Sequence, residues 1–444
     1  MTSQEARQLA RDLFLKTLPH LDAGAKMRAM VRLRDGMLEI AGDRIPLHAG
    51  RPVRVTAMGK AAIEMTRTLA EIMDGAPLRG VVAAPSIPVR PLPGFEYFAG
   101  GHPYPTEQSF AAAQAMLALF NRQGAAPDDV VIFLISGGGS SLAELPLDSS
   151  YTIADWQRFY QRLVTCGANI QEMNTVRKHF SAIKGGRLTE AAEGARQITL
   201  YVSDVPDYLP SIIASGPSMP DESTLSDCSA VLSRYRLIEE FPPVFQPLGR
   251  STREPILGLP ETPKPLHPCF SRSLYYCLLA NGDGVDRLTA LLEQHEFEVA
   301  TDSSCDDWEL TKAADHLLAR LAKLRAENPG RPVAVVSGGE LSCPVTGNGM
   351  GGRNQAFVLD CAQKIAGSDI LVLSAGTDGI DGNSPAAGAV ADGNTTKRAQ
   401  DMGMDAAAYQ RRCDSFHFFE KLCDTIITGP TGTNIRDLRL LLAY

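Results

Sequence analysis

The sequence predicts an α/β protein of two domains with mostly parallel sheets. Strand-like and helix-like segments alternate along nearly the whole chain, which is the pattern of βαβ units. Three apolar, β-branched runs end abruptly at glycine-rich polar loops, namely DDVVIFLISGGGSSL, RPVAVVSGGEL and SDILVLSAGTDGIDG. Buried strands that open into exposed N–H groups form anion sites at the carboxyl edge of such sheets. We therefore expect an enzyme of phosphorylated or carboxylate metabolites.

The first half of the chain supplies a continuous series of these units. β-branched and aromatic runs predict strands, and apolar residues at three- and four-residue spacing predict helices. The expected strands are 52–58, 79–85, 96–100, 128–135 and 197–205. The expected helices are 61–73, 106–120, 153–165, 174–190 and 222–240.

A proline-rich stretch divides the chain. Eight prolines fall between Pro242 and Pro268, and each fixes φ and removes a donor, so no regular element is expected there. The sequence thus predicts an N-terminal domain over 1–245, a connector over 246–268 and a smaller C-terminal α/β domain over 269–444. In the second domain, strands are expected at 273–282, 296–302, 332–337 and 370–375, and helices at 283–295 and 307–327. We expect the last 30 or so residues to pack back on the N-terminal domain.

Composition excludes several classes of protein. The 444 residues carry a net charge of −8 without a run of Lys or Arg, so a nucleic-acid partner is not expected. No apolar stretch approaches the roughly 20 residues of a membrane helix, and the N-terminus lacks a signal-peptide core. The nine cysteines form no CxxC pair and the eight histidines no HExxH motif, which leaves transition-metal catalysis unsupported. We expect a cytoplasmic enzyme, with a homodimer as an open alternative to a monomer.

The N-terminal half has two groups of candidate site residues. Three consecutive glycines allow the backbone to approach an anionic ligand closely, while Lys60 follows a strand at a turn and Asp204 ends another. The glycine loop contributes Ser136, Gly137, Gly138, Gly139 and Ser140. In NTVRKHFSAIKGG, Asn174, Arg177 and Lys184 have near-helical spacing; this pattern fits either converging positive groups or an ordinary charged helix face.

Further candidates follow the strands of the second half. In GGE and GNGMGGRNQ, Glu340 precedes Arg353 and Asn354, and a guanidinium after a glycine loop suits bidentate oxyanion recognition. Two carboxylates, Asp378 and Asp381, follow a buried strand, where they can share a divalent cation or act as a base. The GPTGTN loop adds Thr431, Thr433 and Asn434. Each loop alone is compatible with a simple turn, but five of them after strands favour a common function.

Together these segments resemble the class II glycerate kinases, the glycerate 2-kinases with a C-terminal MOFRL domain. The resemblance rests on ten segments in order. They are GKAA, GHPYPTEQS, LISGGGSSL, NTVRKHFSAIKGGRL, SDV, IASGP, SGGE, GNGMGGRNQ, SAGTDGIDG and TGPTGTNIRDL. It implies an N-terminal Rossmann-like three-layer sandwich and a smaller MOFRL domain, with the substrates in a cleft between them. The family's catalytic lysine would be Lys60, and its acidic and basic site residues Asp204, Glu340, Arg353 and Asp378.

The same resemblance implies ATP-dependent phosphorylation of D-glycerate at the 2-hydroxyl with a divalent cation. For the mechanism we expect Mg²⁺ with Asp378 as its protein ligand and Asp204 as the base. Two alternatives stay open. An NAD(P)H-dependent hydroxypyruvate reductase needs a GxGxxG fingerprint that opens a helix after a strand, and neither GNGMGG nor SGGGSS has that form and context. A non-catalytic module that binds phosphorylated sugars would explain the anion loops but not the joint presence of Lys60, Glu340, Arg353 and Asp378.

Overall fold

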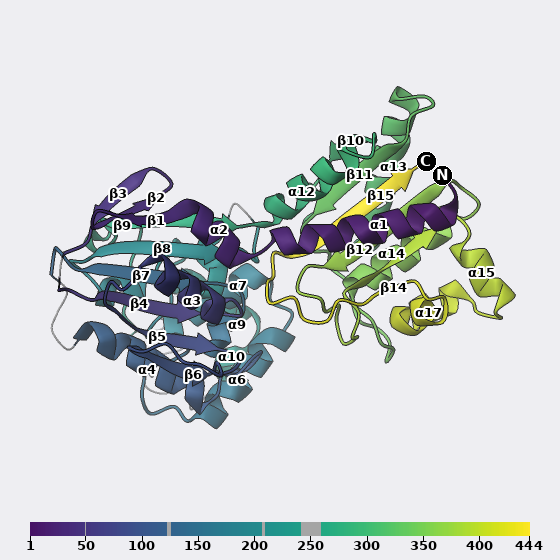
Figure 1. The fold of residues 1–444 in the computed structure, drawn as a ribbon. Helices are drawn as coiled ribbons and strands as arrows, with labels where there is room; N and C mark the ends of the chain where they lie inside the picture. The colour runs from purple at the N-terminus through teal and green to yellow at the C-terminus, as the bar shows by residue number, and fades with distance from the viewer. Residues whose placement is uncertain (49, 122–125, 207–208, 241–258) are drawn as a thin grey trace. The chain divides into compact units, whose positions relative to one another are not determined.

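The computed structural model describes residues 1–48, 50–121, 126–206, 209–240 and 259–444 (Figure 1). It confirms the predicted α/β class. The chain forms two compact units, one of Ala23–Leu278 and the other of Met1–Asp22 with Leu279–Tyr444. No helix among the described residues is long and apolar enough to cross a membrane.

The Ala23–Leu278 unit is organised around a six-stranded sheet of order β6-β5-β4-β7-β8-β9. The first five strands in this order are all parallel to their neighbours. The strands are β4 (Val53–Met58), β5 (Leu78–Ala84), β6 (Phe95–Ala99), β7 (Val130–Ile135), β8 (Arg196–Val202) and β9 (Ser273–Leu279). Every residue of β7 is buried, as its apolar run requires of a central parallel strand.

Helices cover this sheet and connect its strands, as the sequence predicts. They are α2 (Ala23–Met30), α3 (Ala62–Ile72), α4 (Glu107–Asn121), α5 (Gly139–Leu142), α6 (Ile153–Thr165), α7 (Ile170–Phe180), α8 (Arg187–Ala191), α9 (Leu225–Arg234) and α10 (Leu237–Glu240), with the short 3₁₀ segments η2 (Pro210–Ser215) and η4 (Pro268–Phe270). The expected helix over 174–190 was wrong in extent, because α7 ends before Ser181, which is extended and forms a bridge with Pro146.

A small antiparallel meander, which the sequence patterns did not predict, precedes the main sheet. Its strands are β1 (Val31–Arg34), β2 (Met37–Ile40) and β3 (Asp43–Pro46). Each strand has four residues, and only Val31, Leu38, Ile40 and Ile45 are buried. A run this short contains too few alternations to separate a strand from a loop.

The other unit has a mixed sheet of order β10-β11-β15-β12-β13-β14. The strands are β10 (Glu298–Thr301), β11 (Val333–Gly338), β12 (Ile370–Gly376), β13 (Gly388–Asp392), β14 (Thr425–Ile426) and β15 (Asp437–Ala443). The last strand, β15, lies in the centre and runs antiparallel to both β11 and β12. The expectation that the C-terminal residues pack on the N-terminal domain is therefore wrong for this strand. All seven of its residues are buried, which a central strand between two helical layers requires.

Two helical layers enclose that sheet. One apolar cluster joins the sheet to α1 (Ser3–Thr17) and α12 (Asn281–Glu293). A second cluster joins the opposite face to α13 (Leu310–Glu327), α14 (Arg353–Lys364) and α17 (Ser415–Lys421). The remaining helices are η1 (Leu18–His20), α15 (Thr395–Asp401) and α16 (Ala406–Arg411).

The N-terminal helix departs from the expected domain boundary of 1–245. The α1 side chains of Ala6, Ala10, Leu13 and Phe14 are fully buried in the cluster that contains β12 and β15 residues, so α1 belongs to the C-terminal unit (Figure 1). Its amphipathic spacing predicts a buried face, but spacing alone carries no information on which sheet covers that face.

The connector also differs from the expectation where it is described. Residues 246–258 lie outside the described residues, but Thr262 donates to Asp221 at 2.9 Å, and the Asp221 N–H donates to the carbonyl of Pro263 at 3.1 Å. Residues 259–278, including η4 and β9, are thus part of the first unit.

Candidate active-site groups in each unit

In the first unit, the predicted lysine, glycine loop and aspartate converge at the carboxyl ends of β4, β7 and β8. The Lys60 N–H donates to the carbonyl of Gly137 at 2.9 Å, and the Ala61 N–H donates to Ser136 Oγ at 3.0 Å. These bonds join the turn after β4 to the loop after β7. Adjacent parallel strands have their carboxyl ends at the same edge of the sheet. The loops that follow these strands therefore lie close together, although they are far apart in the sequence.

The glycines of this loop are required because other groups lie against them. A methyl group on Gly137 would collide with the carboxylate of Asp204, and one on Gly138 would lie 3.1 Å from the His102 ring and 3.6 Å from Lys60 Cγ. Gly138 also has φ of +81°, which favours glycine. The loop backbone is thus flanked by a carboxylate, an imidazole and the lysine stem, an arrangement that can orient an oxyanion or a hydroxyl group.

His102 is a site residue that the sequence analysis did not single out, although it follows β6 and the glycine pair Gly100–Gly101. Burial lowers the pKa of His102, and the nearby Lys60 charge lowers it further. A neutral imidazole beside the glycine loop can accept a hydrogen bond through one ring nitrogen and donate one through the other. The GHPYPTEQS segment that contains it did form part of the family resemblance.

A chain of hydrogen bonds between side chains holds the Ser136–Ser140 loop in place. The hydroxyls of Ser140 and Ser215 are 2.8 Å apart, and Ser215 donates to Asn174 Oδ1 at 2.6 Å. Ala214 and Ser215 have φ values of +50° and +60°. This left-handed backbone conformation is costly for residues other than glycine, and such residues occur most often at functional sites. Asn174, predicted to bind ligand, is 3% exposed and instead positions the loop through Ser215.

Replacing Ser215 with Ala should therefore lower kcat/KM on the order of ten-fold, because the loop loses its hydroxyl anchor while the left-handed backbone remains. Ser215→Gly relieves the backbone strain and should be more stable than Ser215→Ala in thermal unfolding, yet equally impaired in activity. The exposed Ser226→Ala is the matched control. Wild-type activity in Ser215→Ala would show that the chain from Asn174 to Ser140 does not position the loop.

Two cations that were predicted to bind ligand, Lys184 and Arg177, contact Tyr160. Lys184 is fully buried and forms an ion pair with Glu144 and a 3.0 Å hydrogen bond to the Tyr160 hydroxyl. Burial lowers the pKa of Lys184 to about 8, although Glu144 opposes this shift. The Arg177 guanidinium stacks over the Tyr160 ring at 5.0 Å. This placement argues against ligand contact by Lys184, because its ammonium is enclosed by its own partners.

In the second unit, Arg353 at the start of α14 is held by two carboxylates. It donates through Nε and Nη2 to both oxygens of Asp437, at 2.6 and 3.1 Å, and lies 2.8 Å from Glu340. Burial would lower the pKa of Arg353, but Asp437 and Glu340 outweigh it and raise the pKa. Burial likewise opposes ionisation of Asp437, yet Arg353 holds its pKa below the ordinary value. The Arg353 side chain is 35% exposed, and its guanidinium is fixed in orientation by these carboxylates.

Asp381 and Asn354 organise the N-terminus of α14 and do not extend toward solvent. The two Asp381 oxygens accept the backbone N–H groups of Asn354 and Gln355 at 3.0 and 2.9 Å, as well as their side-chain amides. Burial raises the pKa of Asp381 to about 6, although these donors oppose the shift. Asp381, predicted to bind ligand, thus acts as a buried helix cap that sets the position of Arg353.

The free energy of unfolding should depend on pH because of the buried Asp381 carboxylate. Because its folded pKa of about 6 exceeds the ordinary 3.8, the folded protein binds more protons than the unfolded chain between these values. The contribution of Asp381 to stability therefore falls as pH rises from about 4 to about 6. In thermal unfolding over that range, wild type should lose stability relative to Asp381→Asn, with the exposed Asp401→Asn as control. Parallel pH profiles for wild type and Asp381→Asn would contradict this assignment.

Asp378 and the GPTGTN loop lie at the same edge of the sheet. A methyl group on Gly376 would lie 3.3 Å from Asp378 Oδ1 and 3.5 Å from Asp437 Oδ1, so both carboxylates approach one point. Thr431 donates its hydroxyl to the carbonyl of Thr377 at 2.6 Å, and its N–H to the carbonyl of Asp378 at 3.2 Å. Asn434 accepts the Arg436 N–H at 2.9 Å, and Thr433 is largely buried. These three residues shape the turn around Asp378.

The N-terminal end of β15 contributes groups that the sequence motifs did not indicate. Arg436 binds both oxygens of Asp306 at 2.5 Å, and Asp306 also accepts the Glu340 N–H at 3.0 Å. Arg439 donates to the carbonyls of Gly338 and Gly339 at 3.1 and 2.9 Å. The signals in the sequence were the TGPTGTNIRDL segment of the family resemblance and the alternation of charged and apolar residues in NIRDLRLLLAY, where a buried strand with charges at its start is unusual.

Comparison with known proteins agrees with this arrangement. Residues 9–248 match a domain of unknown function, DUF4147, and residues 333–437 match the MOFRL family. A protein of Thermotoga maritima named D-glycerate 2-kinase is 35% identical over 391 residues, which cover 87% of this chain and 89% of that protein. The chain belongs to the glycerate kinase family. The predicted family resemblance is thereby confirmed.

Other members of the glycerate kinase family show both the shared fold and a mixed nomenclature. The crystal structure of a Thermotoga maritima glycerate kinase matches with a TM-score of 0.80 at 32% identity, over 99% of this chain and all of that chain. An Agrobacterium vitis protein provisionally named a hydroxypyruvate reductase is 35% identical over 434 residues, or 93% of each chain.

Proposed function

We propose that this protein is an ATP-dependent kinase that phosphorylates the 2-hydroxyl of D-glycerate to give 2-phosphoglycerate. The observation that carries the proposal is the match of nearly the whole chain to a D-glycerate 2-kinase, combined with the grouping of Lys60 and Asp204 on one glycine loop. Phosphoryl transfer needs positioning and charge neutralisation more than covalent chemistry, and both units supply groups of that kind.

In the first unit, Asp204 accepts the proton of the 2-hydroxyl while Lys60 neutralises oxyanion charge. The Ser136–Ser140 loop offers N–H groups beside them and is held in place by Ser215. Both side chains lie against the loop backbone, Asp204 at Gly137 and Lys60 at Gly138, and the division of roles follows from their charges, since a carboxylate can accept a proton and an ammonium can neutralise an anion.

In the second unit, Arg353 presents a rigid guanidinium to a carboxylate or a transferring phosphoryl group. Asp437 and Glu340 fix its plane, so little conformational entropy is lost when an oxyanion binds. Asp381 and Asn354 contribute by fixing the helix start, and Thr431, Thr433 and Asn434 by fixing the turn around Asp378.

The residues present fit a Mg²⁺ ion that is shared with nucleotide phosphates. Mg²⁺ is usually held by one or two carboxylates, waters and phosphate oxygens, and Asp378 is a partly exposed carboxylate near the start of β15. Within the described ranges no group of three or more His, Cys, Asp or Glu side chains could hold a metal unaided. When bound, Mg²⁺ would neutralise phosphate charge. Cytoplasmic localisation and homodimerisation stay predictions.

Product analysis tests the reaction. With D-glycerate, ATP and Mg²⁺, the product fed directly to enolase should yield phosphoenolpyruvate without added phosphoglycerate mutase. A requirement for mutase would identify the 3-phosphate and contradict the proposed position.

A parallel incubation with hydroxypyruvate and NADH tests the reductase alternative suggested by the name of the Agrobacterium vitis relative. We expect no loss of nicotinamide absorbance, because the glycine loops lack the dinucleotide fingerprint. Hydroxypyruvate-dependent oxidation of NADH together with inactivity toward ATP would instead favour the reductase.

A further inference from the structure

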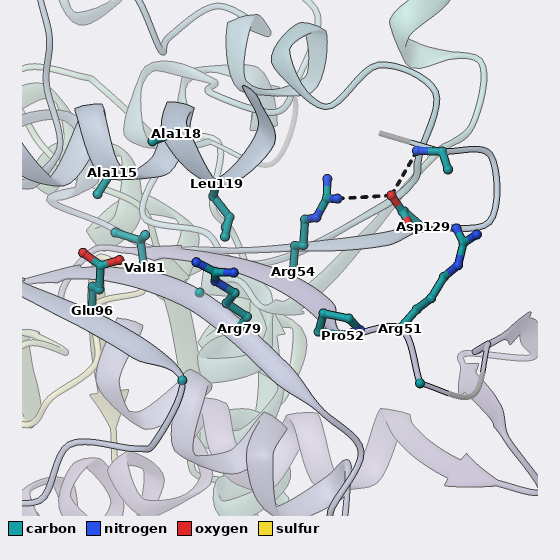
Figure 2. A pocket seen from close by; sticks show the side chains of 14 residues that line it. Arg51, Pro52, Arg54, Arg79, Val81, Glu96, Ala115, Ala118, Leu119 and Asp129 are labelled. Carbon is teal, nitrogen blue, oxygen red and sulfur yellow. Dashed lines mark hydrogen bonds and ion pairs between the residues drawn. The ribbon is translucent and has the colours of Figure 1, made fainter. Parts of the chain in front are cut away.

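A hollow with unusual charge lies at the amino-terminal end of the first unit's sheet, remote along the strands from Lys60 and Asp204. Its volume is about 560 Å³, within the range of about 300–1,000 Å³ typical of small-ligand sites. Arg54, Arg79 and Glu96 from β4, β5 and β6 line it, beneath α4 (Figure 2). No residue of the candidate active site lines it.

The position of Arg79 follows from strand geometry. Val81 packs in the cluster that contains α4, and Arg79, two residues earlier on the same strand, faces the same side. Arg79 is also the direct partner of Arg54 on the parallel strand β4. Like charges placed opposite each other destabilise strand pairs, so an anion bound between these two side chains would relieve their repulsion.

Protein groups offset only one of the two arginines. Asp129 lies 3.3 Å from Arg54 and 3.0 Å from Arg51, and it also accepts the Ala126 N–H at 2.9 Å. Among the described residues, the Arg79 side chain has no hydrogen-bond or ion-pair partner, and the same is true of the Glu96 side chain; both are exposed. In the view of Figure 2, the Arg79 side chain lies between those of Glu96 and Arg54. The hollow therefore presents an uncompensated cation and an uncompensated carboxylate side by side.

The spacing of these two charges is suited to a zwitterion. Glu96 is in register with Val81 on the neighbouring parallel strand, which places its Cα about 8 Å from that of Arg79 by strand spacing and rise. Arg79 and Glu96 are flexible enough to hold opposite charges of one small molecule. The wall on the α4 side is apolar and is formed by Ala115, Ala118 and Leu119, where the two alanines leave room.

We propose that this hollow is a binding site for a free α-amino acid with an apolar side chain. Its carboxylate lies between Arg79 and Arg54, its ammonium group meets Glu96, and its side chain packs on Ala115, Ala118 and Leu119. The site is separate from the proposed kinase reaction, and its occupancy would be sensed through β4, the strand that carries Arg54 near its start and leads to Lys60. It would thus be a regulatory site.

Calorimetric titration of the full-length protein with L-leucine tests the proposal without reference to activity. Two analogues separate the charges: 4-methylpentanoate lacks the ammonium group, and L-leucinamide lacks the carboxylate. Wild type should bind leucine at least about ten-fold more tightly than either analogue, because each leaves one charged group unpaired.

Variants assign the binding to the hollow. Arg79→Ala should weaken leucine binding by about ten-fold or more, and Glu96→Gln should abolish the preference for leucine over 4-methylpentanoate. The exposed loop variant Arg90→Ala, matched in charge change, should bind as wild type does, and both pocket variants should retain basal turnover.

Three outcomes would overturn the proposal: no leucine binding to wild type at millimolar concentration, equal affinity in wild type and Arg79→Ala, or binding of inorganic phosphate alone. The last outcome would identify a simple anion site.

Discussion

Replacing Lys60 with Met should lower kcat/KM for phosphorylation of D-glycerate by about 100-fold or more, which is typical of losing one preorganised charge at a transferring group. The side chain lies beside Gly138, where the glycine loop faces any bound oxyanion. Steady-state kinetics with D-glycerate and ATP measure the change. The melting temperature should change little, because Lys60 stands at a turn and not in an apolar cluster.

A matched control distinguishes the loss of a positive charge at the site from the loss of a positive charge elsewhere on the protein. Lys397 is an exposed lysine of α15, and Lys397→Met should retain wild-type kinetics. If Lys60→Met turned over at nearly the wild-type rate, Lys60 would not belong to the catalytic machinery. A large fall in melting temperature would instead indicate a structural role.

Replacing Arg353 with Lys should reduce activity almost as much as replacing it with Ala. Lysine preserves the charge but cannot donate in parallel to both oxygens of Asp437 and still contact Glu340, as the planar guanidinium does. The orientation of the cation, not its charge alone, is therefore the tested property. Measured kcat/KM values for the two variants should agree within about ten-fold.

Loss of Arg353 complicates this experiment, because it leaves the buried Asp437 with Arg439 at 3.6 Å as its remaining ion-pair partner, and breaking a buried ion pair is strongly destabilising. The double variant Arg353→Ala/Asp437→Asn removes that charge. It should recover thermal stability relative to Arg353→Ala but remain inactive. Recovery of activity along with stability, or full activity in Arg353→Lys, would show that the guanidinium does not contact substrate.

Much of the fold could be predicted from the sequence because the main strands are continuous apolar runs that end at glycine-rich loops. The runs VVIFLI and ILVLSA have no charged residue, and their single polar residue is Ser374 near the end of the second run. Both form buried central strands, β7 and β12. The meander of β1–β3 and the early end of α7 had no comparable signal. Local patterns were too short there, and tertiary contacts decided the conformation.

The candidate site was only partly predictable for a related reason. Residues that follow parallel strands, such as Lys60, Ser136 and Asp204, meet at one edge of the sheet whatever the rest of the fold does. Residues predicted from helix spacing did not follow this rule. Lys184 lies in a buried network with Glu144. Asp381 does follow a strand, β12, yet it caps α14, because burial and pairing depend on neighbours that are distant in sequence.

The sequence alone determined the fold class, the family and the loops that carry chemistry, since these depend on local pattern and on motifs in a fixed order. Only the tertiary structure decided that α1 and β15, from opposite ends of the chain, complete the sheet and helical layer of the same unit. It likewise decided that Asp437 orients Arg353 and that Arg79 lies opposite Arg54. Strand order and register pair residues far apart in sequence, and no local pattern encodes those partners.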